Sequence, residues 1–348
     1  MSDILIQRQG KLGRITMNRP KALNALTFEM TLEMHAALRE FANDTSVASV
    51  LVDGAGERGL CAGGDIRSIY EANRIGDDLA ARFWREEYIM NAFIARYPKP
   101  YIAIMDGIVM GGGIGISAHG SHRIVTERTK AAMPEVAIGF SPDVGGTWLL
   151  SRAPGEFGTF AALTANVLNA GDAIHAGLAD WHVPSSSLPA LVAELSNCVS
   201  RVQVDVVIAR LASEPAAGLH ASEGSWIDSC FAHDDVEAIV DALAANAAEG
   251  ARKAHATMSR HCPKSLKVAL KALREARGLA TLEQCLQMEY RVALACIAEH
   301  DMSEGIRAVV IDKDQKPRWS PATLGDVTQQ HVDAHFAELP IWSRPATG

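Results

Sequence analysis

The chain has 348 residues, of which 48% are hydrophobic and 21% charged, and its formal net charge is -8 at pH 7. This length exceeds one ordinary compact core, so we expect one large domain with an appended region. The acidic balance argues against a nucleic-acid-binding protein, whose surface is typically basic. No apolar segment is long and uncharged enough to span a bilayer, and no N-terminal targeting run is evident. We therefore expect a cytoplasmic protein that makes no membrane contact.

The cysteines follow neither a CxxC pattern nor the spacing of a metal site, and in a cytosolic chain this pattern favours free buried thiols. The expected partners therefore include neither a metal ion nor a disulfide framework. The six residues concerned are Cys61, Cys198, Cys230, Cys262, Cys285 and Cys296.

The first 115 residues alternate between strand and helix patterns. Residues 4–9 and 13–17 predict two strands around a turn at 10–11, and short apolar runs predict buried strands at 47–52 and 101–105. Helical spacing predicts helices at 27–44, with Thr27 as N-cap, at 77–97, and from Gly112 onward. Residues 54–64 form a predicted loop with five glycines. This alternation is typical of a wound α/β sheet whose ligand loops follow the strand ends.

After residue 143 the strand signal largely disappears, and alanine- and leucine-rich segments predict helices. Residues 184–187, a Pro-Ser-Ser-Ser turn, mark a candidate boundary. We expect a core with the active site over residues 1–200 and a helical C-terminal region over residues 201–348. The predicted helical segments are 156–165, 172–177, 188–202, 205–212, 233–247, 264–277 and 281–298.

Two glycine-rich loops follow predicted strands, one at residues 60–65 and one at residues 111–113. Backbone N–H groups from two such loops can converge on one oxygen and form an oxyanion hole. Each loop alone is also compatible with a tight strand-to-helix turn, and the second with the start of a phosphate loop. Ile116 stands where that phosphate motif requires its last glycine. The two loops together favour the oxyanion hole.

Two carboxylates, Glu135 and Asp143, lie downstream of the second glycine loop. Apolar neighbours of Glu135 favour a perturbed pKa and acid–base use, although a charge at a helix N-terminus is an alternative. Asp143 is equally suited to cap a helix that begins near Val144. The helical pattern around Glu87 predicts a solvent-facing side chain.

Several motifs together resemble the crotonase (enoyl-CoA hydratase/isomerase) superfamily, and within it the branch that hydrolyses 3-hydroxyisobutyryl-CoA. The resemblance extends from about residue 4 to residue 339. It implies a ββα spiral core with an α-helical C-terminal region, an acyl-CoA substrate, and no cofactor beyond the coenzyme A of that substrate. Relatives often form trimers and hexamers through C-terminal helices, so a homo-oligomer is one possibility, and the alternative is that the longer helical region covers its own active site. The motifs are residues 18–26, 61–67, 85–88, 111–115, 134–135, 142–146 and 304–314.

The resemblance also assigns roles to individual residues. It places the oxyanion donors at the N–H groups of Gly64 and Gly112, and the second hydratase glutamate at Glu135. The first hydratase glutamate falls at Gly115, where this chain has no carboxylate. The hydrolase branch adds an aspartate that matches Asp143. The remaining matches are a substrate-contacting glutamate at Glu87, which reverses the pattern-based prediction, and coenzyme A contacts at Lys21, Ala22, Leu23, Ala62 and Asp65.

These assignments predict hydrolysis of a short-chain 3-hydroxyacyl-CoA thioester by an oxyanion hole and a Glu/Asp pair. Two alternatives remain open at this point. One is an enoyl-CoA hydratase or isomerase, and the other is a non-catalytic relative that binds coenzyme A or RNA. The acidic composition and the absence of a basic, aromatic-interleaved stretch disfavour RNA.

Overall fold

The computed structural model describes residues 2–338. The chain divides into two compact units, each built from three separate segments. We call Met1–Asp65, Met90–Met133 and Val167–Ser222 the strand unit, and Ile66–Ile89, Pro134–Asn166 and Glu223–Gly348 the helical unit. Each of these units contains residues from both sides of position 200. The two units are therefore not the two domains predicted from the sequence, and the predicted boundary after residue 200 stays a prediction.

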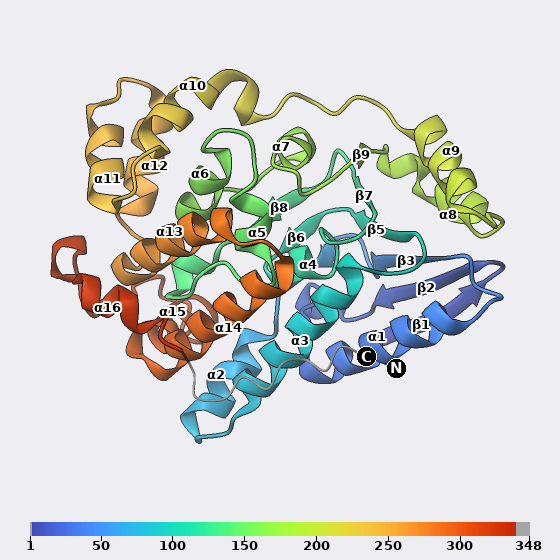
Figure 1. The fold of residues 1–348 in the computed structure, drawn as a ribbon, viewed down its shortest axis with the longest axis horizontal. Coiled ribbons are helices and arrows are strands. Elements are labelled where there is room, and N and C mark those ends of the chain that lie inside the picture. Colours follow the sequence, from blue (N-terminus) through green and yellow to red (C-terminus); the bar gives the residue numbers. More distant parts are fainter. Residues whose placement is uncertain (1, 339–348) are drawn as a thin grey trace. The chain divides into compact units, whose positions relative to one another are not determined.

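The strand unit contains all the described strands, in two sheets (Figure 1). The six-stranded sheet has the order β1-β2-β3-β5-β7-β9, and the three-stranded sheet has the order β4-β6-β8. Only β1 and β2 pair antiparallel, as the predicted hairpin; the other pairs are parallel. The strands are β1 (Ile4–Gln9), β2 (Leu12–Met17), β3 (Ser49–Gly54), β4 (Gly59–Cys61), β5 (Tyr101–Met105), β6 (Ile108–Met110), β7 (His122–Val125), β8 (Lys130–Ala132) and β9 (Trp181–His182).

From β3 onward, successive strands alternate between the two sheets. Each turn of the chain therefore adds one strand to each sheet, which is the ββα spiral that the resemblance implied. The predicted strands at 4–9, 13–17, 47–52 and 101–105 correspond to β1, β2, β3 and β5. The sequence prediction of an unbroken loop over 54–64 was wrong, because β4 lies within it and pairs with β6.

Apolar residues of the parallel strands and of two helices form the core of the strand unit. Leu51, Ile102 and Ile124 come from the sheet, and Leu191 and Ile208 come from α8 (Leu188–Leu195) and α9 (Arg201–Leu211). Figure 1 shows α8 and α9 side by side. The unit also contains η1 (Pro20–Ala22), α1 (Phe28–Asn43), α4 (Gly112–Gly115), α7 (Ala170–His175) and η3 (Ser185–Ser187).

Two of these helices begin where the sequence predicted. Thr27 caps α1 and accepts a hydrogen bond from Met30 N, so the expected N-cap is confirmed. Helix α4 begins at Gly112, also as predicted.

The described elements of the helical unit are all helical, and its core includes Ala272, Ala276, Cys285 and Met288. The elements are α2 (Ile66–Arg74), α3 (Leu79–Ala95, whose last residues belong to the strand unit), η2 (Glu135–Ile138), α5 (Gly146–Leu150), α6 (Phe157–Thr164), α10 (Leu219–Phe231, shared likewise), α11 (Val236–Ala245), α12 (Glu249–Met258), α13 (Pro263–Gly278), α14 (Leu282–Ala298), α15 (His300–Ile306), the π-helical η4 (Arg307–Ile311), η5 (Leu324–Asp326) and α16 (Gln329–Ala334). Helices α2, α10, α12, α15 and α16 were not predicted from the sequence.

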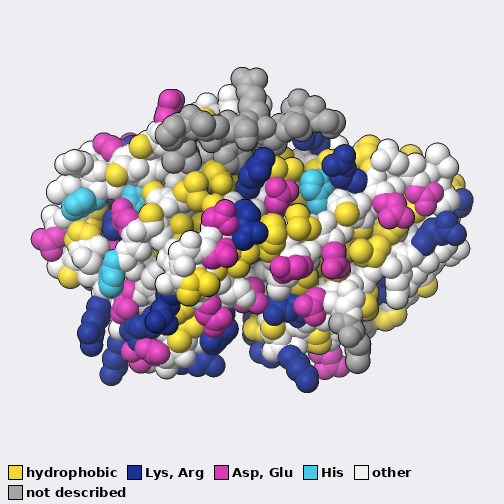
Figure 2. All heavy atoms as spheres, turned by 90° about the horizontal axis from the view of Figure 1, so that it is seen from below, with side chains coloured by type: hydrophobic (Ala, Val, Ile, Leu, Met, Phe, Trp, Pro, Cys, Tyr) yellow, Lys and Arg dark blue, Asp and Glu magenta, His cyan; other side chains and the backbone are white. Residues whose placement is uncertain are grey.

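Within residues 2–338, no helix has both the length and the apolar character of a membrane span. On the face seen in Figure 2, acidic and basic side chains are interspersed with hydrophobic ones, and no broad basic stripe is visible. All six cysteines are buried, and none of them forms a disulfide within residues 2–338.

We predict that Gly113→Ala destabilises the protein by about 1–3 kcal/mol, as overpacking does. A β-carbon on Gly113 would lie 2.4 Å from the backbone oxygen of Cys61, so the backbone must shift. Urea unfolding measures the change. Gly224→Ala is the control, since nothing lies within 4 Å of its added β-carbon. Equal stability of Gly113→Ala and the wild type would contradict this account of the loop packing.

Candidate active site

Two backbone N–H groups at the predicted oxyanion positions have no acceptor among the described residues. Gly64 follows β4, and Gly112 is the first residue of α4, where the helix itself supplies no acceptor for the N–H group. The flanking residues are bonded instead: Asp65 N donates to Leu26 O at 2.8 Å, and Gly111 N donates to Ala132 O at 3.2 Å. Both predicted donors therefore remain available to a ligand oxygen.

Glycines bring these two loops of the strand unit together. Gly63 has a φ of +109°, and a β-carbon on it would lie 3.8 Å from Gly112 N. Gly111 has a φ of +48°, in the left-handed region that glycine tolerates without strain. The two loops are thus neighbours, which is the arrangement that an oxyanion hole requires.

Hydrogen bonds in the strand unit connect the loops that the resemblance assigns to coenzyme A. Ala62 N donates to Leu23 O at 3.0 Å, and Arg19 pairs with Asp65 at 3.1 Å. Buried Asn24 accepts from Arg19 N at 2.9 Å and donates to the backbone oxygens of residues 55 and 59. Lys21 and Ala22, by contrast, are exposed on η1. The predicted coenzyme A residues therefore lie on adjoining segments, although no contact with a ligand is observed.

The three predicted carboxylates, Glu87, Glu135 and Asp143, all belong to the helical unit and are all buried. Glu87 lies on α3, and Glu135 begins η2. Asp143 lies in the loop that leads into α5. Close packing against α15 fixes η2, since a β-carbon on Gly305 would lie 2.3 Å from Ile138 O.

Burial raises the pKa of each of these carboxyl groups. The pKa of Asp143 rises to about 7 through burial, which the hydrogen bond from Tyr88 opposes. Burial, and secondly the charge of Asp143, hold the pKa values of Glu87 and Glu135 well above their ordinary range. A carboxyl group with a raised pKa can keep its proton at a pH where an ordinary one is ionised, which suits it to donate a proton.

Some buried polar atoms of the helical unit have no hydrogen-bond partner among residues 2–338. These atoms include Glu87 Oε1, Glu135 Oε2 and Ser141 Oγ. Buried polar atoms are nearly always paired, so such atoms are typical of a site that is completed by a ligand or by water. The unpaired oxygens of the two glutamates are consistent with the substrate-facing roles assigned to them.

The pattern-based prediction that Glu87 faces solvent was wrong, because its side chain is 2% exposed. Phe83, Trp84 and Tyr88 on the same helix are also buried. Glu87 follows the first two by about one turn, so it lies on the buried stripe. A count of the apolar spacing over all of α3 would have placed it there.

The predicted capping role of Asp143 was also wrong. Helix α5 begins at Gly146 and receives no side-chain cap from its N-terminal side. Asp143 Oδ2 instead accepts a hydrogen bond of 2.6 Å from Tyr88 Oη. The donors at the start of α5 are satisfied by Glu289, a buried residue of α14 that the sequence analysis missed.

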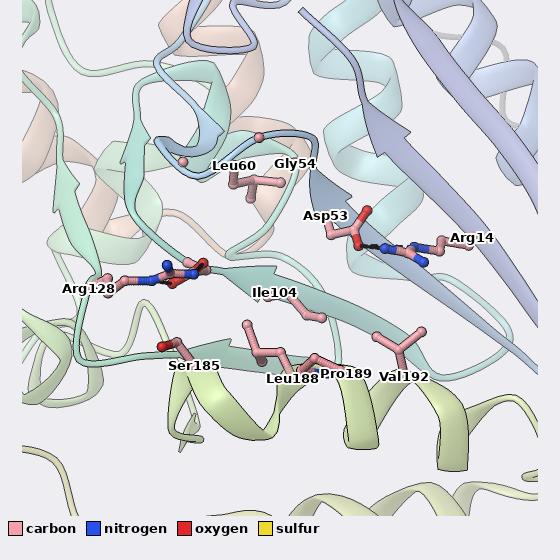
Figure 3. Close-up of a pocket in the computed structure, with 13 residues that line it drawn as sticks. Arg14, Asp53, Gly54, Leu60, Ile104, Arg128, Ser185, Leu188, Pro189 and Val192 are labelled. Carbon is pink, nitrogen blue, oxygen red and sulfur yellow. Dashed lines mark hydrogen bonds and ion pairs between the residues drawn. The ribbon is translucent and has the colours of Figure 1, made fainter. Parts of the chain in front are cut away.

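A separate cavity of about 500 Å³ lies in the strand unit (Figure 3). Its lining includes Arg14 with Asp53, Arg128 with Asp106, and apolar residues of α8. Each arginine is neutralised by an aspartate, so the cavity offers no net positive charge to an anion. Neither predicted oxyanion glycine and none of the three carboxylates lines it.

The structure thus groups the predicted site residues into two sets. The strand unit brings together the oxyanion glycines and the coenzyme A loops, and the helical unit brings together the three carboxylates. Position 115, which the resemblance aligns with the first hydratase glutamate, is a buried glycine of α4.

Comparison with known proteins gives one family and consistent relatives. A family model described as enoyl-CoA hydratase/isomerase matches residues 12–336. A zebrafish (Danio rerio) protein called 3-hydroxyisobutyryl-CoA hydrolase, mitochondrial, is 41% identical over 345 residues, covering 97% of this chain and 90% of the relative. The human (Homo sapiens) protein of the same name is 39% identical over 344 residues, covering 97% and 89%.

Two solved structures are also similar over nearly the whole chain. A carnitinyl-CoA dehydratase from Mycobacterium thermoresistibile is 47% identical, with a TM-score of 0.93 and 98% of each chain covered. An enoyl-CoA hydratase from Rhodobacter sphaeroides 2.4.1 is 40% identical, with a TM-score of 0.89, covering 97% of this chain and 98% of the other. The names of these relatives differ in the reaction but share the acyl-CoA substrate.

We predict that Asp143→Asn flattens the pH dependence of stability. A carboxyl group with a raised pKa stabilises the fold most below its ordinary pKa, and this stabilisation is lost as pH rises through about 7. For each unit by which the pH rises, the unfolding free energy of the wild type should therefore fall by up to about 1.4 kcal/mol more than that of the variant. Urea unfolding at pH 5, 6 and 7 measures this difference.

Asp333→Asn is the control, because Lys271 and Gln329 lower the pKa of that carboxyl, whose contribution changes only at more acidic pH. Equal slopes for wild type and Asp143→Asn would show that Asp143 has no raised pKa.

Proposed function

The chain belongs to the enoyl-CoA hydratase/isomerase family, and we propose that within it the protein hydrolyses 3-hydroxyisobutyryl-CoA to 3-hydroxyisobutyrate and coenzyme A, a step of valine breakdown. The observation that carries the proposal is the cluster of buried carboxyl groups at Glu87, Glu135 and Asp143, together with a glycine at position 115. The names of the zebrafish and human relatives agree with it.

In this proposal, the N–H groups of Gly64 and Gly112 stabilise the negative charge that develops on the thioester oxygen. Glu135 either attacks the carbonyl carbon, expelling the thiolate and leaving a mixed anhydride that water then hydrolyses, or removes a proton from the attacking water. Asp143, whose pKa is about 7, orients the substrate hydroxyl or donates a proton to the departing thiolate. Glu87 contacts the acyl end.

The main alternative is hydration or dehydration of the acyl chain, which the names of the two solved relatives describe. A hydratase manages water addition across a double bond with two glutamates, and the first would stand at Gly115. Glycine has no group that can transfer a proton. The residues present therefore favour cleavage of the thioester.

The proposal needs no cofactor beyond the coenzyme A carried by the substrate. A homo-oligomer and a cytoplasmic location belong to the same proposal, although the vertebrate relatives are called mitochondrial. Light scattering of the purified protein tests the first, and cell fractionation tests the second.

We predict that the protein releases free thiol from 3-hydroxyisobutyryl-CoA and that Glu135→Gln slows this by about 10²–10⁴-fold, the range for loss of an acid–base group. A thiol-reactive dye follows the release, and the absorbance of crotonyl-CoA follows hydration in parallel. Glu71→Gln, at an exposed position of α2, is the matched control. Loss of crotonyl-CoA absorbance without thiol release would contradict the hydrolase and indicate a hydratase, whereas no change in either would indicate a binding protein.

A single turnover in heavy-oxygen water distinguishes the two routes for Glu135. We predict that a mixed anhydride leaves one heavy oxygen in the Glu135 carboxyl group of those molecules in which water attacks the anhydride at the Glu135 carbonyl carbon. Mass spectrometry of the peptide detects this fraction, and the remaining molecules carry the label in the released acid. An unlabelled peptide after complete turnover would instead show that Glu135 activates water.

A further inference from the structure

We infer that Glu289 is a positioning residue that holds Asp143 in its working geometry. Glu289 lies on α14, 144 residues after Gly145, yet it accepts hydrogen bonds from Gly145 N at 2.7 Å and from Thr147 N at 3.0 Å. Thr147 Oγ1 donates a third, of 2.5 Å. The carboxylate thus binds both ends of the turn that follows Asp143. The inference rests on the proposed function, because it concerns the role given there to Asp143.

The turn needs such an anchor because its backbone is strained. Val144 has a φ of 52°, a conformation that β-branched residues rarely adopt, and Gly145 continues it with a φ of 77°. Strain of this kind persists only where surrounding contacts impose it, and it is often found at functional sites. Gly146 N donates to Asp143 O at 2.6 Å, which connects the anchored turn directly to Asp143.

Asp143 is consequently fixed from two sides. Tyr88 Oη holds its side chain at 2.6 Å, and Glu289 holds the backbone that follows it. Helix α14 is a rigid base for this contact, because its N-terminus carries a capping box of Thr281 and Gln284. A functional group supported by regular structure keeps its geometry better than one on an unsupported loop.

A purely stabilising role does not explain a carboxylate at this position. Glu289 is 2% exposed, and no described lysine, arginine or histidine forms an ion pair with it. Burying an unpaired charge is costly, and an uncharged residue of the same volume is often more stable. Cys285 Sγ also donates to Glu289 Oε1, at 3.7 Å, and lies 3.1 Å from Thr147 Oγ1. The whole arrangement orients donors toward one carboxylate.

The test compares Glu289→Gln with the wild type by release of thiol from 3-hydroxyisobutyryl-CoA. The amide nitrogen of glutamine cannot accept, so one or more of the three donors loses its partner. We expect kcat to fall about 10- to 100-fold, as for a small displacement of a reacting group, while KM stays within about twofold. The loss of kcat should exceed any loss of folded protein, which the thermal midpoint of the variant measures.

Thr147→Val removes one of the three hydrogen bonds and should lower kcat less, whereas Thr147→Ser keeps the hydroxyl and should restore it. Asp172→Asn is the matched control, because this carboxylate is 1% exposed and accepts from His220 N, but belongs to the strand unit. Wild-type kcat in Glu289→Gln would overturn the inference, as would a loss of kcat that follows a loss of folded protein. A wild type that releases no thiol would instead contradict the proposed function.

Discussion

The burial of several carboxyl groups without a cation is the constraint on which the candidate site depends. Glu87, Glu135, Asp143 and Glu289 are each at most 6% exposed, and no described basic side chain pairs with any of them. Burial, and after it the charges of neighbouring carboxylates, raises the pKa values of Glu87, Glu135 and Glu289, so the fold is most stable when some of them keep a proton. Burial of these groups lowers the stability of the fold, and it also raises the pKa of Asp143 to about 7, which suits a proton donor at neutral pH. Such a cluster is characteristic of a catalytic site and not of a structural core.

The cluster also separates two kinds of carboxylate by their hydrogen bonds. Glu289 has donors for both oxygens, which favour its charged form, although burial still raises its pKa to about 8. Glu87 and Glu135 each keep one oxygen without a partner. A satisfied carboxylate supports its neighbours, while an unsatisfied one is available to a substrate. This difference agrees with the supporting role inferred for Glu289 and the substrate-facing roles proposed for Glu87 and Glu135.

Local patterns in the sequence predicted the parts of the fold that local physics determines. The hairpin, the cap at Thr27 and the strand at residues 101–105 follow from turn, capping and burial preferences within a few residues. Strand β4 was missed because its three residues contain a glycine and depend on pairing with β6, a contact distant in sequence. Glu289 was missed for the same reason, since nothing near it in the sequence indicates the turn that it anchors. Asp143 was identified, but its partner Tyr88 was not.

The choice between hydrolase and hydratase shows what fold similarity cannot decide. Relatives with either name share this fold, and the identity to the dehydratase structure, 47%, exceeds the 41% to the zebrafish hydrolase. The reactions differ in where the enzyme must place a proton, which depends on single side chains. Gly115 is a buried residue of α4 and carries no carboxylate. Glu87 lies on α3, and Asp143 directly precedes the strained turn that Glu289 holds. In the proposed mechanism the proton donor is therefore Asp143 and not an acid at position 115, and this placement favours cleavage of the carbon–sulfur bond over addition to a carbon–carbon double bond.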